Sequence, residues 1–269
     1  MPAPTLPPLY DGDLEPTRTG FNPTVNDVVE VRRMFTDEGI GDRRVRVPME
    51  IALMILPLAE YHPRQTSVTQ AEAIYRADEF WRPGPHASII GLYLTVATLP
   101  VPDTVARAKS ITFQMKAADQ GWATWGGDGT YDNSHTWYEA SILRPRSAAS
   151  TVAALTDACI PNFPDVGEAR DHLQNQNQNH GWDMVESNGT VVWKVHNNIT
   201  ASGQYRYYRV DWVAGIPTEV DASGAMGDGQ GFLGLLRPDD VVVLWARAEQ
   251  QAWINKIQGA TMEIAYEVL

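Results

Sequence analysis

The sequence predicts a mainly β protein, a jelly-roll-type antiparallel β-sandwich with a helical extension on its N-terminal side. From about residue 86 to the end, short stretches of alternating or continuous apolar residues recur between loops of uneven length. Before that point the apolar residues follow helical spacing instead. We therefore divide the chain into an irregular arm (1–24), a helical extension (25–85) and a β-sandwich domain (86–269).

The arm is rich in proline, threonine and acidic residues, which is typical of irregular chain. It is either a disordered tail or a segment packed over a sheet. In the extension, Val28, Val29, Val31 and Met34 fit one helix. A second helix, VPMEIALMILPLAEY, is expected to open at Pro48 and to kink or end at Pro57. A third is predicted over Val68 to Phe80.

The sandwich domain contains seven stretches that we interpret as strands. They are Ala87 to Thr98, Arg107 to Ala117, His135 to Leu143, Val191 to His196, Gln204 to Trp212, Asp239 to Ala248 and Ala260 to Leu269. Residues 150–160 indicate a short helix. Residues 161–187 are polar and include the run DHLQNQNQNHGWD, which predicts an exposed insertion.

Composition excludes several classes of partner. The 269 residues carry 33 acidic against 21 basic side chains, a net charge of −12. Nucleic acids and anionic membranes both require a concentrated basic face, so neither is an expected partner. Cys159 is the single cysteine and the first residues lack the features of a signal peptide, so we expect a cytoplasmic protein.

The sequence predicts neither a metal site nor a cofactor. The six histidines are not spaced as zinc or iron ligands. Asp128, Asp132 and Asn133 offer oxygen ligands for calcium, but they fit better as turn residues that bind their own backbone. Cys159 has no histidine near it in the sequence, so we interpret it as a small buried hydrophobe.

One stretch concentrates aromatic residues among glycines. It is DQGWATWGGDGTYDNSHTWYEAS, residues 119–141, and it joins two predicted strands. Its glycines permit positive φ angles, which suits a tight turn region. The aromatic rings can either plug the open end of a sandwich or face a ligand, and for most of them we favour the plug because large aromatics are usually buried.

This stretch, extended to DQGWATWGGDGTYDNSHTWYEASILRPR, resembles a signature of fungal proteins with a galactose-binding-like, phloem-lectin-like β-sandwich. The C-terminal segment VVLWARAEQQAWINKIQGATMEIAYEV is similar to the closing strands of the same group, and VPMEIALMILPLAEYHPR looks like the F-box-like helix that often precedes the domain. The resemblance covers residues 47–62 and 86–269. It implies a fold that hosts glycan binders, interaction modules and small biosynthetic enzymes, so function must be argued from the site.

Sugar rings stack on tryptophan or tyrosine, while their hydroxyls pair with acids, amides and arginines. The candidate ligand-binding residues that fit this need are Trp122, Trp125, Tyr131, Asn133, His135, Tyr205, Tyr207, Trp245, Arg247 and Trp253. Core packing or arginine–aromatic stacking is the competing role for each of them. If the protein is an enzyme, the polar candidates are His135, Glu139, Arg206, Arg247 and Asp211.

Three functions are consistent with these residues. The first is ligand recognition, most plausibly of a glycan. The alternative is a cofactor-free cyclase or pericyclase that folds a polyketide or terpenoid metabolite in an aromatic pocket. A second alternative is an interaction adaptor that uses the F-box-like helix. The ligand is thus a glycan or another small molecule, and the aromatic run Gln204 to Trp212 could also form a homodimer interface.

Overall fold

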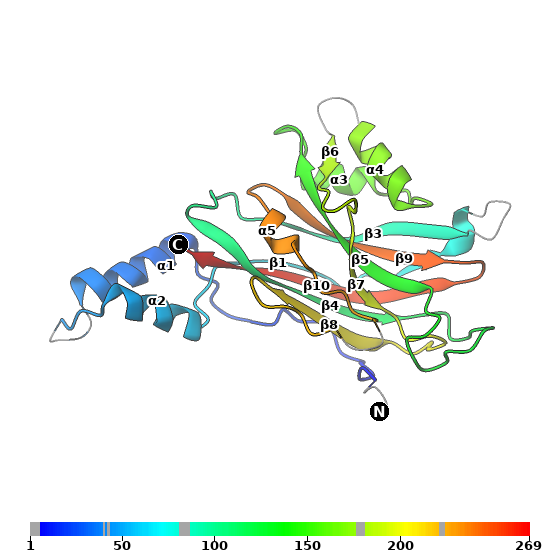
Figure 1. Ribbon diagram of the computed structural model, residues 1–269, viewed down its shortest axis with the longest axis horizontal. Coiled ribbons are helices and arrows are strands. Elements are labelled where there is room, and N and C mark those ends of the chain that lie inside the picture. The colour runs from blue at the N-terminus through cyan, green and yellow to red at the C-terminus, as the bar shows by residue number, and fades with distance from the viewer. Residues whose placement is uncertain (1–5, 40, 42–43, 81–86, 176–180, 221–223) are drawn as a thin grey trace.

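The protein folds into two five-stranded antiparallel sheets packed face to face (Figure 1). The computed structural model describes residues 6–39, 41, 44–80, 87–175, 181–220 and 224–269. The strands are β1 (Arg64–Thr69), β2 (Ala73–Arg76), β3 (Ser88–Ala97), β4 (Ala106–Ala118), β5 (Thr136–Pro145), β6 (Trp182–Met184), β7 (Trp193–Asn197), β8 (Arg206–Val213), β9 (Val241–Glu249) and β10 (Ile254–Val268).

The strand order is that of a jelly roll. The first sheet runs β1-β10-β4-β8, with β2 also paired to β10. The second sheet runs β3-β9-β5-β6, with β7 also paired to β5. From β3 onward the chain crosses repeatedly between the sheets, which is how a jelly roll closes its core. The predicted fold class, a mainly β jelly-roll sandwich with an N-terminal helical extension, is confirmed.

The main core lies between the inner faces of the two sheets. Period-two alternation along β4 sends Ile111, Phe113, Met115 and Ala117 inward. The same alternation in β8 turns Tyr208, Val210 and Trp212 into this core. The aromatic run that could have formed a homodimer interface is therefore largely used in packing within the chain.

A second core lies on the outer face of the second sheet, beneath α3 (Val152–Ala158) and α4 (Val166–Asn175) (Figure 1). It includes Leu173, Trp182 and Trp245. The prediction that residues 161–187 form an exposed insertion is therefore wrong for the described part of that range. Most residues of α4 are polar, so the sequence did not indicate a buried helix. One face of α4 is nevertheless buried through Ala169 and Leu173. Residues 176–180 lie outside the described residues.

The helical extension is shorter than predicted. It contains α1 (Val25–Arg33), a single π-helical turn (Met34–Glu38) and α2 (Met49–Leu58), which ends one residue after Pro57 as expected. The prediction of a third helix over Val68 to Phe80 is wrong. That segment forms β1 and β2 and then a 3-10 turn (Ala77–Phe80), because its threonine, valine, isoleucine and tyrosine suit strands paired with β10.

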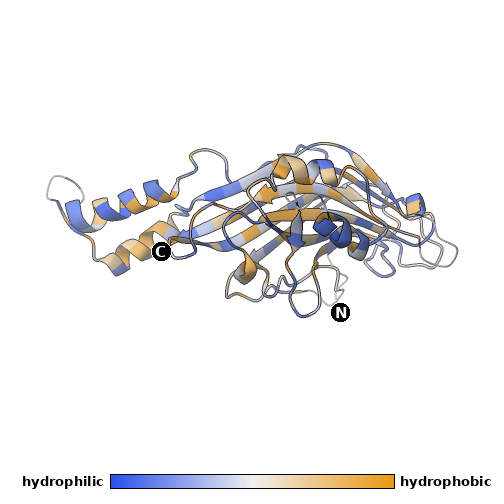
Figure 2. Ribbon diagram, turned by 90° about the horizontal axis from the view of Figure 1, so that it is seen from above, coloured by the Kyte–Doolittle hydropathy of each residue, from blue (hydrophilic) through white to orange (hydrophobic). Residues whose placement is uncertain are grey.

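This correction also moves the start of the sandwich. The first sheet already includes Arg64, so residues 64–76 belong to the sandwich and not to a helical extension over 25–85. The predicted boundary at residues 85 and 86 lies outside the described residues. Figure 2 shows the α1–α2 pair projecting beyond one end of the sandwich, with α2 the more apolar of the two.

The N-terminal arm is irregular, and its described residues cross the outer face of the first sheet. Near β8, the amide of Tyr207 donates to the Pro8 carbonyl at 3.0 Å. Near β1, the Asn22 side chain exchanges hydrogen bonds with the Arg64 backbone at 2.9 and 3.0 Å. Of the two interpretations of this segment, packing over a sheet is thus the one observed for residues 6–24.

Candidate functional site

The loop between β4 and β5, residues 119–135, is the candidate site and is called here the tryptophan loop. It projects from the end of the sandwich opposite the α1–α2 pair (Figure 1). Asp119 anchors its start. This buried carboxylate accepts hydrogen bonds from the amides of Gly121 at 2.7 Å and Ala201 at 2.6 Å. Burial raises the pKa of Asp119 to about 6, against the opposing effect of these amides.

The rest of the loop is tied to the segment that follows β7. Thr200 exchanges backbone hydrogen bonds with Gly129 and Thr130 at 2.9 and 2.8 Å, and its hydroxyl donates to the Asp132 carbonyl at 2.8 Å. Gly127 has a φ of 88°, and a Cβ there would lie 2.1 Å from that same carbonyl oxygen. Only glycine fits this close approach. The loop is therefore held by specific hydrogen bonds along its length.

Two indole rings stand out from this fixed loop. The side chain of Trp125 is 81% exposed and that of Trp122 is 50% exposed. The Asn133 amide donates to the Trp125 carbonyl at 3.3 Å, and the Gln120 amide donates to the Trp122 carbonyl at 2.8 Å. Two exposed aromatic rings on one loop offer flat apolar faces on which a ligand ring can stack. The same loop also carries four hydrophilic side chains, of which the last three are exposed: Gln120, Asp128, Asp132 and Asn133.

Other aromatic residues of this region are buried, as the plug interpretation predicted. Tyr131 packs in the main core with its ring 5.4 Å from that of His196. Trp253 is buried, with its ring 4.8 Å from the half-buried ring of His135. Burial lowers the pKa of His135. Tyr131 and Trp253 therefore support the site from below and offer no open stacking face to a ligand.

A buried network of amides and hydroxyls connects the two sheets under the loop. Asn255 of β10 accepts from the Tyr138 hydroxyl at 2.6 Å and from the Asn198 amide at 3.0 Å. Its own amide donates to the carbonyls of Trp137 and Arg247 at 3.1 and 2.9 Å. Buried networks of this kind fix one arrangement of the elements that they join.

Trp245 and Arg247 are two residues apart on β9, so both side chains lie on the outer face of the second sheet. Trp245 is fully buried in the second core and donates to the Ser141 hydroxyl at 3.0 Å, so it is not accessible to a ligand. Arg247 pairs with Glu139 at 2.8 Å and Glu249 at 3.1 Å. Its guanidinium also stacks 5.0 Å from the centre of the Trp137 ring.

The candidates on β8 and just before it contact the arm or the turn between β1 and β2. Tyr207 donates to Gln114 at 2.7 Å and packs against Tyr10, and Tyr205 donates to Glu72 at 3.0 Å. Arg206 donates to the carbonyl of Pro7 at 2.6 Å.

The five enzyme candidates do not form one catalytic cluster. Asp211 accepts from Thr112 at 2.6 Å on the outer face of the first sheet, beside Arg209, and Arg206 is on the same strand. Glu139 and Arg247 are on the opposite sheet, and His135 precedes it. Among the described residues, no three histidine, cysteine, aspartate or glutamate side chains are grouped as metal ligands. No described helix is long and apolar enough to cross a membrane.

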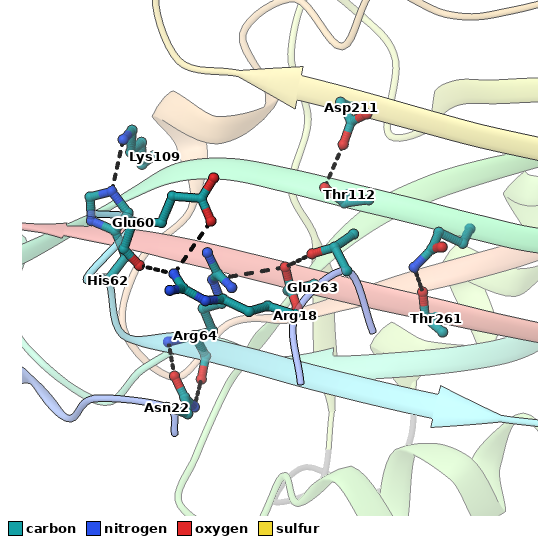
Figure 3. Close-up of polar contacts among 12 residues, drawn as sticks. Arg18, Asn22, Glu60, His62, Arg64, Lys109, Thr112, Asp211, Thr261 and Glu263 are labelled. Atoms are coloured by element: carbon teal, nitrogen blue, oxygen red, sulfur yellow. Dashed lines mark hydrogen bonds and ion pairs between the residues drawn. The ribbon is translucent and has the colours of Figure 1, made fainter. Parts of the chain in front are cut away.

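Sequence reasoning missed a second polar site. Arg64 and Glu263 meet on the outer face of the first sheet, beside a cavity under the arm (Figure 3). Arg64 lies in the predicted helical extension, and Glu263 is nearly two hundred residues further along the chain, in β10. The only signal in the sequence was the acidic residue in the alternating final strand.

Comparisons with known proteins give little further information. No family model matches the chain, and no curated protein matches it significantly. Among solved structures, similarity is found to the "Crystal structure of decameric BFDV Capsid Protein", with 13% identity over 78% of this chain and 98% of that chain and a TM-score of 0.29. A similarity of this strength carries no argument about function.

Proposed function

We propose that this protein is a lectin-like β-sandwich that binds a glycan on the tryptophan loop. The observation that carries the proposal is the exposure of Trp125 on a loop held by Asp119, Thr200 and Asn133. Because the loop is already fixed, a ligand that stacks on the indole loses little free energy in ordering it. Neighbouring acid and amide groups supply hydrogen-bond partners for sugar hydroxyls.

The exposed groups favour a glycan over a hydrophobic metabolite. Ligand sites for apolar metabolites are concave and mostly apolar, with a few convergent polar groups. Here the two rings stand on a projecting loop, and the catalytic candidates are divided between the two sheets. The geometry therefore supports recognition without covalent chemistry.

The test is a glycan array, followed by calorimetry on any glycan that is bound. Trp125→Ala should weaken binding by about 2 kcal/mol, roughly 30-fold, as expected for loss of a central aromatic anchor. Trp125→Phe should retain part of the affinity because it keeps a flat ring. Ile160→Ala truncates a 75% exposed apolar residue outside the loop and serves as the control. If no glycan binds at about millimolar concentration, the proposal fails.

A second candidate function rests on α2. Six of its ten residues are apolar and exposed, and Leu58 is 81% exposed. Such a surface is typical of a protein-interaction site. It supports the adaptor alternative, in which the F-box-like helix binds a ubiquitin-ligase scaffold. Leu53→Asp should abolish co-purification with the scaffold while Ile160→Asp should not. Equal recovery with both variants would contradict the adaptor function.

A further inference from the structure

A polar cavity lies beneath the N-terminal arm and is called here the arm cavity. Its volume is about 330 Å³, at the lower end of the range of ligand pockets. Arm residues 16 and 18–23 close one side, and the start of β1 and the outer face of β10 form the other. Its lining includes Arg18, Phe21, Tyr61, His62, Arg64 and Glu263.

Two buried charged groups in this cavity have incomplete hydrogen bonding. Glu263 is 5% exposed, and the side chain of Arg64 is 13% exposed. Arg64 Nε lies 3.9 Å from Glu263 Oε1, too far for a hydrogen bond. Thr17 already donates to that oxygen. Among the described residues neither Arg64 Nε nor Glu263 Oε2 has a partner, although both atoms are buried.

Buried polar atoms are almost always hydrogen-bonded, and charged ones cost most when they are not. An occupant must therefore accept a hydrogen bond from the guanidinium and donate one to the carboxylate. A hydroxyl group does both, and a pair of neighbouring hydroxyls can serve the two atoms separately. Figure 3 shows the Arg64 guanidinium and the Glu263 carboxylate pointing toward each other from β1 and β10.

The charge around the cavity favours a neutral occupant. Two guanidinium groups, Arg18 and Arg64, face two carboxylates, Glu60 and Glu263, so the formal charges cancel. His62 adds none near neutral pH, because burial and its cationic neighbours lower its pKa to about 4.

The arm cavity also has an aromatic side. The rings of Phe21 and Tyr61 stack with their centres 6.3 Å apart. They supply an apolar surface for the C–H groups of an occupant whose hydroxyls face Arg64 and Glu263.

We propose that the arm cavity is a second binding site, which takes a neutral polyhydroxylated molecule of about monosaccharide size. The hydroxyls bind between Arg64 and Glu263, and the ring rests near Phe21 and Tyr61. The arm itself forms one wall, since Asn22 is hydrogen-bonded to the Arg64 backbone and Thr17 to Glu263. This site does not rest on the tryptophan loop, which lies at the far end of the sandwich.

The experiment is an amide-resolved NMR titration of the full chain with methyl glucoside, methyl galactoside, methyl mannoside and myo-inositol. At least one of these should shift the amide signals of Thr66 and Glu263 saturably. Glu263→Gln keeps the shape but removes the charge, and it should weaken that binding at least tenfold. Arg64→Lys keeps the charge but removes the Nε donor, and it should also weaken binding.

Two control variants distinguish binding in the arm cavity from binding elsewhere on the protein. Glu267→Gln changes an acid on the same face of β10 that pairs with Arg107, and it should leave binding unchanged. Trp125→Ala should also leave it unchanged, so failure of the glycan proposal and failure of this one are distinguishable. The proposal is overturned if no probe gives a saturable shift, which means that water alone fills the cavity. Glycine and inorganic phosphate are titrated as charged comparison probes. The proposal is also overturned if binding survives Glu263→Gln, or if a charged probe binds and none of the four neutral probes does.

Discussion

Asn255→Ala should destabilise the sandwich strongly, because this one side chain makes four hydrogen bonds, three of them to strands of the opposite sheet. At about 1 kcal/mol net for each bond, the full loss is about 4 kcal/mol. Two partners keep a second contact, the Tyr138 hydroxyl to the Lys256 carbonyl at 3.4 Å and the Asn198 amide to Thr136 at 3.0 Å. We therefore expect a loss of about 3 kcal/mol.

The assay is urea unfolding followed by tryptophan fluorescence, with the free energy of unfolding taken from the midpoint and the slope. Gln258→Ala is the matched control. It removes a half-buried amide from the same strand that makes no hydrogen bond to the described residues, and it should cost under about 1 kcal/mol. If Asn255→Ala costs no more than the control, the network does not couple the sheets.

A double variant makes the test sharper. Tyr138→Phe removes the 2.6 Å hydrogen bond to Asn255 and keeps the buried ring. The two substituted side chains are hydrogen-bonded to each other, so their effects should not add, and the coupling should be about 1 kcal/mol. Additive effects would contradict the assigned hydrogen bond.

Two further predictions concern stability at other sites. His62 has its pKa lowered from 6.5 to about 4, chiefly by burial and then by Lys109. Between pH 6.5 and 4, His62 is protonated in the unfolded chain but stays neutral in the folded chain. The free energy of unfolding should therefore fall by at most about 3 kcal/mol as the pH drops over this range. The same loss in His62→Asn would contradict this assignment. Gly229→Ala places a Cβ 2.2 Å from the Trp212 ring at a φ of 62° and should cost over about 2 kcal/mol. Gly126→Ala, at positive φ in open space, should cost about 1 kcal/mol, and equal costs would refute the packing argument.

The sequence predicted the sandwich because its central strands alternate or run apolar over many residues. β4 and β10 are the clearest cases, because alternate residues along both strands are apolar and lie in the main core. The short strands β1 and β2 were missed because each is too brief to show a period. Their role comes from pairing with β10, a long-range contact that local pattern does not contain.

The candidate site was predicted only in part. The tryptophan loop was identified as the centre of interest, but residue type did not show that Trp122 and Trp125 are exposed while Tyr131 and Trp253 are buried. Exposure depends on how a loop folds over its neighbours, and this loop is held by hydrogen bonds to Thr200, which lies in a distant segment. The buried pair in the arm cavity was not predictable for the same reason.

The most direct test of the glycan proposal follows the indole N–H signals of the protein by NMR during titration with a glycan selected on an array. We expect saturable shifts for Trp122 and Trp125. The buried indoles of Trp212 and Trp245 serve as internal references and should not move. A bound glycan that leaves the Trp125 signal unchanged, or the absence of any binding glycan, would contradict the proposed function.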